Sequence, residues 1–291
     1  MEFCIHNDTL RVGADTLGAE LSFITGTNGT DYLWPGQSTI WQDRAPNLFP
    51  YVARLTEGKY SYRGMFYPLP IHGFASRSQF TGELLSKTEM LFSLSSTAET
   101  LETYPFPFRF TVGYRLEENR LYLEYTVENA GSDLMHFGIG AHPGFRVPLE
   151  SGLGFRDYFI EFPFSCQPQR IGFTEQCFLN GEDSPFPLQE GRFLPLSHSM
   201  FDNDAIVLRN MPRQATLRSL KGSKAVSVSF PDMPYLGIWH RPGTDAPYIC
   251  IEPWKSLPSR QGIIEDLETQ PTLETLSPHE QSHYTITITL S

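Results

Sequence analysis

Residues 108–127 read FRFTVGYRLEENRLYLEYTV and carry the strongest structural signal in the chain. Large apolar side chains alternate with mostly polar ones on both sides of a short polar segment, residues 117–120. A period of two places every second side chain on the same face of a β-strand. The stretch therefore predicts a hairpin with one buried face, formed by Phe108, Phe110, Val112, Tyr114 and Leu116 in one strand and Leu121, Leu123, Tyr125 and Val127 in the other.

The same alternation recurs as far as the C-terminus. Apolar residues alternate with Ala and Ser at 225–230 and with Thr at 284–290. No segment keeps apolar residues at positions i, i+3, i+4 and i+7 over three turns between plausible caps, so no long helix is expected. Proline-rich stretches such as 104–107 and 184–187 are typical of connections between strands. We predict an all-β fold, a large antiparallel β-sandwich, with residues 1–291 forming a single domain.

Composition and charge restrict the class of partner. The chain has 22 Lys and Arg against 33 Asp and Glu, a net charge of −11. Such a surface repels a polyphosphate backbone, so nucleic acid is not an expected partner. No run approaches the roughly 18 consecutive apolar residues of a membrane span, and the start lacks the features of a secretory signal. We expect a cytoplasmic protein without a membrane partner, whose four cysteines are free thiols.

Three short stretches interrupt the alternation, and each contains an ionisable side chain. His72 lies in LPIHGFASR (69–77), His142 in GIGAHPGF (138–145) and Glu252 in YICIEPW (248–254). A histidine or carboxylate at a strand end, followed by Gly or Pro, is expected on a bend where a cleft can form. Phe74 and Trp254 lie two residues beyond His72 and Glu252, and aromatic faces suit the C–H-rich faces of a sugar ring.

The residues alone leave several kinds of site open. Each histidine, taken singly, is compatible with a structural role in an aromatic-rich sheet. Glu252 is more informative, because a carboxylate after an apolar run must be paired, hydrogen-bonded or shifted in pKa. Two histidines and a carboxylate are also compatible with a metal site, although no two of them have the close spacing of H-x-H or H-E-x-x-H. The candidates are an acid–base enzyme, a metal-dependent β-sandwich sugar isomerase and a non-catalytic carbohydrate-binding protein.

Five segments, in this order, make the chain similar to the aldose 1-epimerase (galactose mutarotase-like) family. They are NLFPYVARL (47–55), IHGFA (71–75), GAHPGF (140–145), YLGIW (235–239) and CIEPW (250–254), and the resemblance extends from about residue 5 to the C-terminus. It implies a large β-sandwich, called a supersandwich, with a sugar cleft on one sheet. It also implies interconversion of the α and β anomers of a free aldose, with no metal and no cofactor.

The resemblance assigns roles residue by residue. Glu252 takes the place of the general base and His142 that of the general acid, and burial of Glu252 is expected to raise its pKa. Ordinary pKa values then predict a bell-shaped pH profile, with its acidic limb set by Glu252 and its basic limb by His142. The substrate-binding side chains implied are Arg54, His72, Phe74, Trp254 and an aspartate at 202 or 204, of which Asp204 is preferred over Asp202.

The substrate and the assembly are less closely defined. The resemblance implies a hexose such as galactose or glucose as the sugar partner, although the motifs around His72 and Glu252 resemble a divergent branch of the family. A hexose 6-phosphate is the alternative and requires additional basic residues near the cleft, to which Arg77 could contribute. We expect a monomer or a homodimer.

Overall fold

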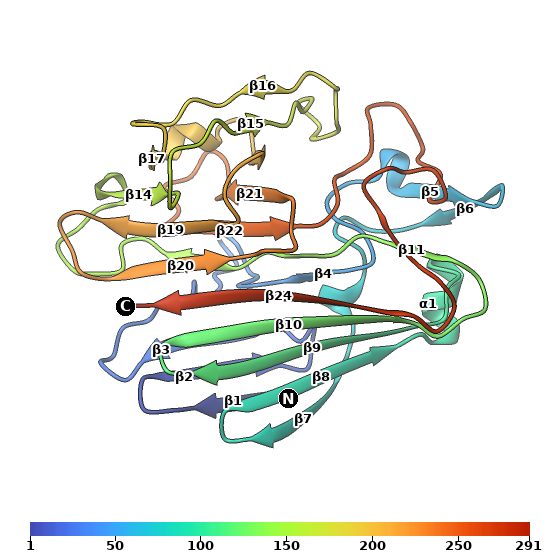
Figure 1. Ribbon diagram of the computed structural model, residues 1–291, viewed down its shortest axis with the longest axis horizontal. Coiled ribbons are helices and arrows are strands. Elements are labelled where there is room, and N and C mark those ends of the chain that lie inside the picture. The colour runs from blue at the N-terminus through green and yellow to red at the C-terminus, as the bar shows by residue number, and fades with distance from the viewer.

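The computed structural model describes all residues 1–291, and two large antiparallel sheets dominate it (Figure 1). The nine-stranded sheet has the order β17 (Phe193–Pro195), β14 (Tyr158–Glu161), β19 (Gln214–Ser219), β20 (Ala225–Ser229), β24 (Gln281–Leu290), β10 (Arg120–Asn129), β9 (Phe108–Glu117), β8 (Glu89–Ser95) and β7 (Thr81–Ser86). The eight-stranded sheet has the order β16 (Ser184–Pro185), β15 (Gln169–Arg170), β18 (Ile206–Arg209), β21 (Tyr235–Trp239), β22 (Tyr248–Trp254), β12 (Gly140–Ala141) and β4 (Asn47–Leu48), and β13 (Gly144–Arg146) pairs with β22.

Smaller elements complete the fold. One three-stranded sheet contains β1 (Glu2–His6), β2 (Leu10–Asp15) and β3 (Leu21–Gly26), and the two-stranded sheets are β5 (Lys59–Tyr62) with β6 (Met65–Pro68) and β11 (Met135–Phe137) with β23 (Glu274–Leu276). The helices are α1 (Ala98–Thr103) and four single 3₁₀ turns, η1 (Thr56–Gly58), η2 (Ala75–Arg77), η3 (Phe155–Asp157) and η4 (His198–Phe201). No helix has the length and apolar character needed to cross a membrane.

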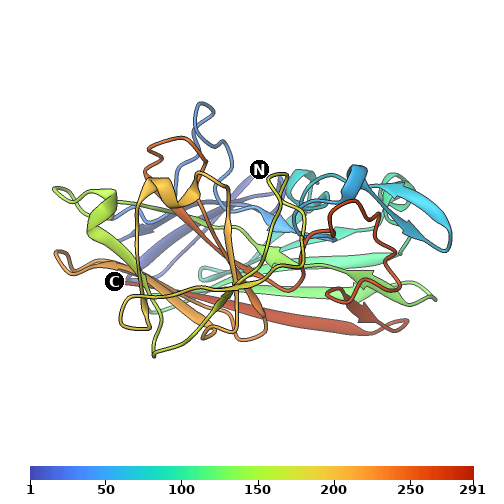
Figure 2. The same cartoon turned by 90° about the horizontal axis from the view of Figure 1, so that it is seen from above.

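The sandwich is held together by one large apolar core. A cluster of 65 buried side chains, from Ile5 to Leu290, includes residues from both large sheets. Figure 2 shows the C-terminal strand β24 along one side of the molecule and the N-terminal segment toward the other. The antiparallel β-sandwich expected from the sequence is confirmed.

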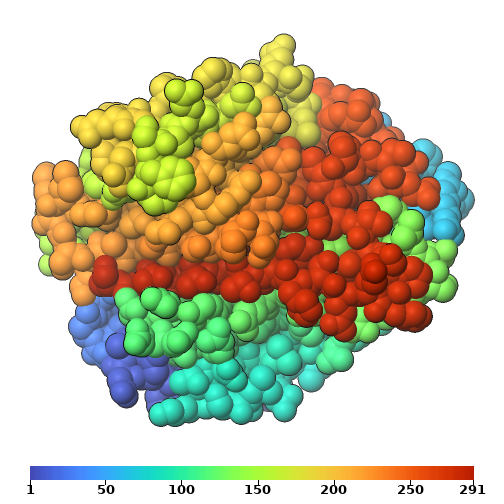
Figure 3. Space-filling model, in the orientation of Figure 1, coloured from blue at the N-terminus to red at the C-terminus, as the bar shows by residue number.

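The predicted hairpin is the pair β9–β10. Leu116 pairs with Leu121 and Tyr114 with Leu123, so the apolar positions lie opposite one another on the buried face. Strand β24 then pairs with β10 and places Ile286 and Ile288 in the same core. Figure 3 shows the outer face of this sheet, where β24 runs as a red band between its neighbours.

Short helices and free thiols also agree with the sequence. Helix α1 has six residues and is preceded by the N-cap residue Thr97, which forms a reciprocal capping box with Thr100. All four cysteines are free, and only Cys250 is fully buried.

Strand β22 positions the candidate site, and here one expectation was wrong. Glu252 does not lie at an interrupted strand end; it lies inside β22, all seven residues of which are buried. The N–H groups of Ile251 and Lys255, two residues to either side of Pro253, donate to the carbonyls of Pro143 and Ile139. The register places Pro253 opposite Ala141 of β12, so the ladder continues past the proline with one N–H donor missing.

Alternation along β22 separates two environments. Ile249 and Ile251 belong to the main core between the sheets. Cys250 and Trp254 belong to two small apolar clusters on the opposite face, and Glu252 lies between them on that face. The carboxylate is therefore surrounded by apolar side chains on a sheet face that is itself covered.

Candidate active site

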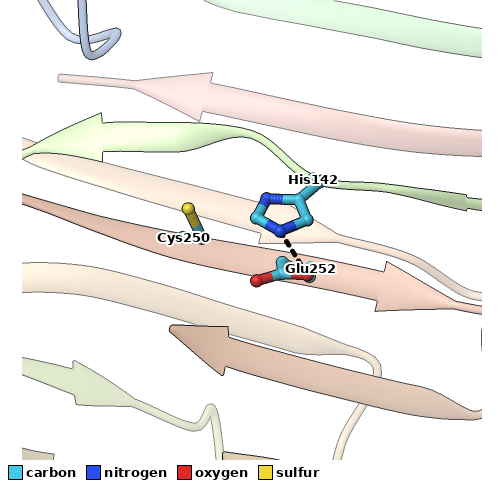
Figure 4. A group of neighbouring side chains, drawn as sticks. All are labelled: His142, Cys250 and Glu252. Carbon is cyan, nitrogen blue, oxygen red and sulfur yellow. Dashed lines mark ion pairs between the residues drawn. The ribbon is translucent and has the colours of Figure 1, made fainter. Parts of the chain in front are cut away.

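Strand register brings the two central groups together. Gly140 of β12 pairs with Trp254 of β22, and Gly144 of β13 pairs with Cys250. The same register carried through the interruption places His142 directly opposite Glu252, as a cross-strand pair. Nε2 of His142 lies 3.2 Å from Oε2 of Glu252, and only 11% and 2% of the two side chains are exposed (Figure 4).

This pair forms part of the lining of a cavity of about 420 Å³. The cavity collects side chains that are far apart in the sequence, including Arg54, His72, Phe74, His142, Asp204, Glu252 and Trp254. Every side chain nominated from the sequence thus lies at this cavity, and of the two candidate aspartates only Asp204 lines it.

Burial shifts both members of the central pair toward their neutral forms. Burial raises the pKa of Glu252 well above its ordinary value, and the charge of Asp204 raises it further. Burial also lowers the pKa of His142 to about 4. One proton held between Nε2 and Oε2 satisfies both groups, whereas Nδ1 of His142 and Oε1 of Glu252 have no hydrogen-bond partner. The arrangement is a buried acid–base pair with unused hydrogen-bonding capacity.

His72 is held in a defined tautomer. The backbone N–H of Ala53 donates to Nδ1 of His72 at 3.2 Å, and the backbone N–H of His72 donates to the Ala53 carbonyl at 3.0 Å. Burial, followed by the charges of His142 and Arg54, lowers the pKa of His72 to about 3. The ring is therefore neutral, with its proton on Nε2, and can donate one hydrogen bond.

Asp204 is oriented by its neighbours at the rim of the cavity. Its Oδ1 accepts a hydrogen bond from the N–H of Ala205 at 2.9 Å, and its Oδ2 accepts one from the Cys177 thiol at 3.2 Å. Burial raises the pKa of Cys177 to about 11, so the thiol keeps the proton that it donates. Arg54 also lines the cavity and is exposed, so carboxylate and guanidinium are both available to a polar ligand.

Two tryptophans that the sequence reasoning did not nominate form an aromatic wall. The rings of Trp41 and Trp239 lie 5.1 Å and 5.5 Å from the ring of His142, and Trp41 also stacks on Tyr248 at 5.2 Å. Alternation in β21 could have indicated Trp239, because residues 235, 237 and 239 share the face that Glu252 occupies. Trp41 lies in an irregular segment, where no periodicity points to it.

Gly237 is a further residue that the sequence reasoning missed. It pairs with Glu252 across β21 and β22. A Cβ atom at Gly237 would lie 3.1 Å from Cβ of Glu252 and 3.2 Å from Cζ2 of Trp254. Glycine at this position therefore leaves room for the carboxylate in its observed position.

The second arginine of the cavity is already paired. Nη1 and Nη2 of Arg77 donate to the two carboxylate oxygens of Asp43 at 2.8 and 2.7 Å. Both residues line the cavity. The bidentate pair neutralises Arg77 and leaves Arg54 as the cavity cation without an ion-pair partner.

Three potential metal ligands also meet at the floor of the site. One donor atom each from His142, Cys250 and Glu252 lies within 4.8 Å of the other two. The metal alternative considered from the sequence had His72 in place of Cys250. The sulfur was missed because Cys250 follows the plain apolar alternation of β22.

The chain is similar to known proteins in both sequence and fold. A family model described as aldose 1-epimerase matches residues 1–266. The chromosomal LacX protein of Lactococcus lactis subsp. lactis is 33% identical over 296 residues, covering 98% of each chain. A galactose mutarotase related enzyme from Lactobacillus acidophilus is 31% identical, with a TM-score of 0.95 and coverage of 100% of this chain and 97% of that one. A galactose mutarotase-like protein from Lactobacillus casei ATCC 334 has a TM-score of 0.93 at 31% identity, with both chains covered completely.

Proposed function

The chain belongs to the aldose 1-epimerase family, a family of carbohydrate isomerases, and we propose that it interconverts the α and β anomers of a free hexose such as galactose or glucose. The observation that carries this proposal is the buried contact between His142 and Glu252 at the floor of the cavity. A binding protein has no use for a carboxylate and an imidazole that share a proton away from water.

The chemistry of anomer exchange requires two groups close together. The ring opens when the proton leaves the C1 hydroxyl and another proton reaches the ring oxygen. Because both oxygens are bonded to C1, the base and the acid that serve them must be near neighbours. The separation of 3.2 Å between Oε2 of Glu252 and Nε2 of His142 suits two groups that act on the same carbon.

The number of protons on the pair determines the roles of Glu252 and His142. With one proton on the pair, the reactive form has an ionised Glu252 and a protonated His142. Glu252 takes the hydroxyl proton while His142 delivers its proton to the ring oxygen, which leaves a neutral acid, a neutral imidazole and the open-chain aldehyde. After rotation about the C1–C2 bond, both transfers reverse and close the ring on the other face. The pair passes between two forms that contain the same number of protons.

The pKa directions then reverse the assignment of the two limbs of the pH profile. Activity requires a single proton on the pair. As the pH falls toward about 4, His142 gains a proton while Glu252 keeps its own, and the base is lost. As the pH rises through the raised pKa of Glu252, the last proton leaves and the acid is lost. The acidic limb therefore belongs to His142 and the basic limb to Glu252, although the measured values describe the coupled pair.

The remaining polar groups suit the positioning of sugar hydroxyls. Nε2–H of His72 and the guanidinium of Arg54 are donors, and the carboxylate of Asp204 is an acceptor, all at the cavity. Such contacts hold C1 against the acid–base pair. Phe74 and Trp254 supply apolar surface for the C–H faces of the ring, although Phe74 also packs its other edges against Phe49 and Tyr104.

Charge at the cavity favours a free sugar over a sugar phosphate. Arg77 is engaged by Asp43, so Arg54 is the cavity arginine without an ion pair. Asp204 lies at the same cavity and would repel a phosphate dianion. A bound phosphate normally requires several charge-assisted donors, which this site does not offer.

A polarimetric assay on a panel of sugars tests the proposal. Freshly dissolved α-galactose and α-glucose, and their 6-phosphates, are followed with and without enzyme. We expect faster mutarotation of the free hexoses and a smaller effect on the phosphates. Acceleration confined to the phosphates would show the hexose-6-phosphate alternative to be correct. Tight sugar binding without any acceleration would instead identify a carbohydrate-binding protein.

A further inference from the structure

Cys250 is a buried nucleophilic group for which the proposed reaction has no role. It lies two residues before Glu252 on the same face of β22, and it is fully inaccessible to solvent. The surrounding cluster is apolar and includes Trp34, Ala246 and Tyr248. A small apolar side chain would fill this place equally well, so packing alone does not require sulfur here.

We propose that His142, Cys250 and Glu252 form a binding site for a thiophilic divalent cation of the Zn²⁺ class, and that its occupation inhibits the enzyme. The inhibition rests on the proposed function, because two of the three ligands are the proposed acid and base. The cation site itself rests on the geometry alone.

Distances and ligand types support a three-coordinate protein site. The donor atoms lie within 4.8 Å of one another, whereas tetrahedral zinc ligands lie roughly 3.5 Å apart, given Zn–S and Zn–N bonds of about 2.3 and 2.0 Å. The most distant pair must therefore close by about 1 Å. Imidazole nitrogen, thiolate sulfur and carboxylate oxygen are the three ligand types that zinc uses in proteins.

An unpaired carboxylate oxygen beside the His142–Glu252 contact supports the same site. Oε1 of Glu252 is buried without a hydrogen-bond partner, and the indole Nε1–H of Trp254, whose hydrogen bonding lowers the pKa of this carboxyl, is buried and unpaired as well. Figure 4 shows the Cys250 sulfur and the unpaired oxygen of Glu252 on the same side of the His142–Glu252 contact. Because His142 and Glu252 line the cavity, a cation can reach them through it, and Cys250 lies behind them on the same strand face.

Binding of the cation releases protons and should compete with binding of the sugar. The cation displaces the thiol proton of Cys250 and the proton held between His142 and Glu252, and both go to water. The metal-bound pair can then neither accept the hydroxyl proton nor protonate the ring oxygen. Sugar and cation therefore exclude each other, and a higher sugar concentration should raise the cation concentration needed for half-inhibition.

The first experiment measures mutarotation against Zn²⁺ in a non-chelating buffer. We expect inhibition that EDTA reverses and that Mg²⁺ and Ca²⁺ do not reproduce, because they prefer oxygen ligands. In Cys250→Ala the uninhibited rate should stay within a few-fold of the native rate. The half-inhibitory Zn²⁺ concentration should rise at least about 100-fold, since even groups that only support a metal ligand change affinity about 10–100-fold. Cys166→Ala is the matched control, since that thiol lies outside the cavity, and it should be inhibited like the native enzyme.

The second experiment needs no activity and separates the two hypotheses. Native protein titrated with Co²⁺ should develop a thiolate-to-cobalt charge-transfer band that is absent in Cys250→Ala, and Cys250→Ser repeats the test should the alanine variant not fold. Equal Zn²⁺ inhibition of native and Cys250→Ala enzyme, or no thiolate band in native protein, overturns the cation site. A Cys250-dependent band without any loss of activity supports the cation site and overturns the catalytic assignment of Glu252 and His142.

Discussion

The substitution Glu252→Gln removes the proposed base and little else. Glutamine has almost the same shape, and its amide can still contact Nε2 of His142, which lies 3.2 Å from the present carboxylate. It cannot accept the hydroxyl proton. Since the residue is 1% exposed, water cannot readily replace the lost base. We therefore expect kcat to fall at least about 10²-fold, within the 10²–10⁴ range for a general catalyst. A 10²-fold loss corresponds to about 2.7 kcal/mol of transition-state stabilisation.

The same substitution, Glu252→Gln, should lower activity but increase the stability of the folded protein above about pH 4.5. The folded-state pKa of Glu252 is raised, so its stabilising contribution is complete only below the unfolded pKa and declines as the pH rises through the folded value. Glutamine does not titrate. The variant should therefore gain thermal stability relative to the native protein as the pH increases above about 4.5. The gain is at most about 1.4 kcal/mol for each pH unit, until the folded pKa is passed.

A second buried glutamate provides the matched control. Glu265 is also 1% exposed, but it accepts hydrogen bonds from the backbone N–H, Nε and Nη2 of Arg260 and lies outside the cavity. Glu265→Gln should leave kcat within a few-fold and destabilise the protein by about 2 kcal/mol, because charge-assisted hydrogen bonds are lost. Polarimetric kinetics and thermal unfolding of both variants provide the comparison. Near-native turnover of Glu252→Gln would refute its role as the base.

Four further predictions use the same assay. The kcat profile of the native enzyme should be bell-shaped, with an acidic limb near pH 4 from His142 and a basic limb from Glu252; a basic limb that persists in Glu252→Gln would contradict this order. Arg54→Ala should raise KM more than it lowers kcat, since its contacts to hydroxyls persist from ground state to transition state, and an unchanged KM counts against a binding role. Gly237→Ala should lower kcat, because the added Cβ displaces Glu252. Gly113→Ala, whose added Cβ has no contact closer than 3.6 Å, should leave kcat unchanged. Equal activity of the two variants would show that the room beside Glu252 left by Gly237 is not needed for turnover. Activity should survive prolonged treatment with chelators, and loss of activity that added metal restores would favour the metal-dependent alternative.

Elements with short-range signals were predictable from the sequence. The hairpin β9–β10 follows from alternation over twenty residues and a turn, and Glu252 follows from a carboxylate at the end of an apolar run. In both cases the signal is local, because the apolar face of a strand and a carboxylate in an apolar run can each be recognised within a short stretch of sequence. The position of Glu252 inside β22 could not be predicted in the same way, because a proline normally argues against a central strand, and Pro253 follows Glu252 directly.

Groups whose partners are distant in sequence could not be derived from local patterns. The contact of His142 with Glu252 depends on the register between β22 and the strands β12 and β13, which are 110 residues away and only two or three residues long. Cys177 bonds to Asp204 from a loop, and Trp41 covers His142 from another. Loop positions of this kind carry no periodic signal, so only the folded chain reveals them.

The proposed acid–base pair and the proposed sugar-binding groups are held in place by different parts of the fold. Glu252 and His142 are fixed by strand register in the eight-stranded sheet, next to a glycine that leaves them room. His72, Cys177 and Asp204 instead lie on loops with φ of 64°, 64° and 68°, a left-handed conformation that non-glycine residues adopt only when their surroundings enforce it. A change in loop sequence can therefore move the groups proposed to contact sugar hydroxyls without altering the proposed acid–base pair. For this reason membership in the family constrains the reaction more strongly than it constrains the identity of the sugar.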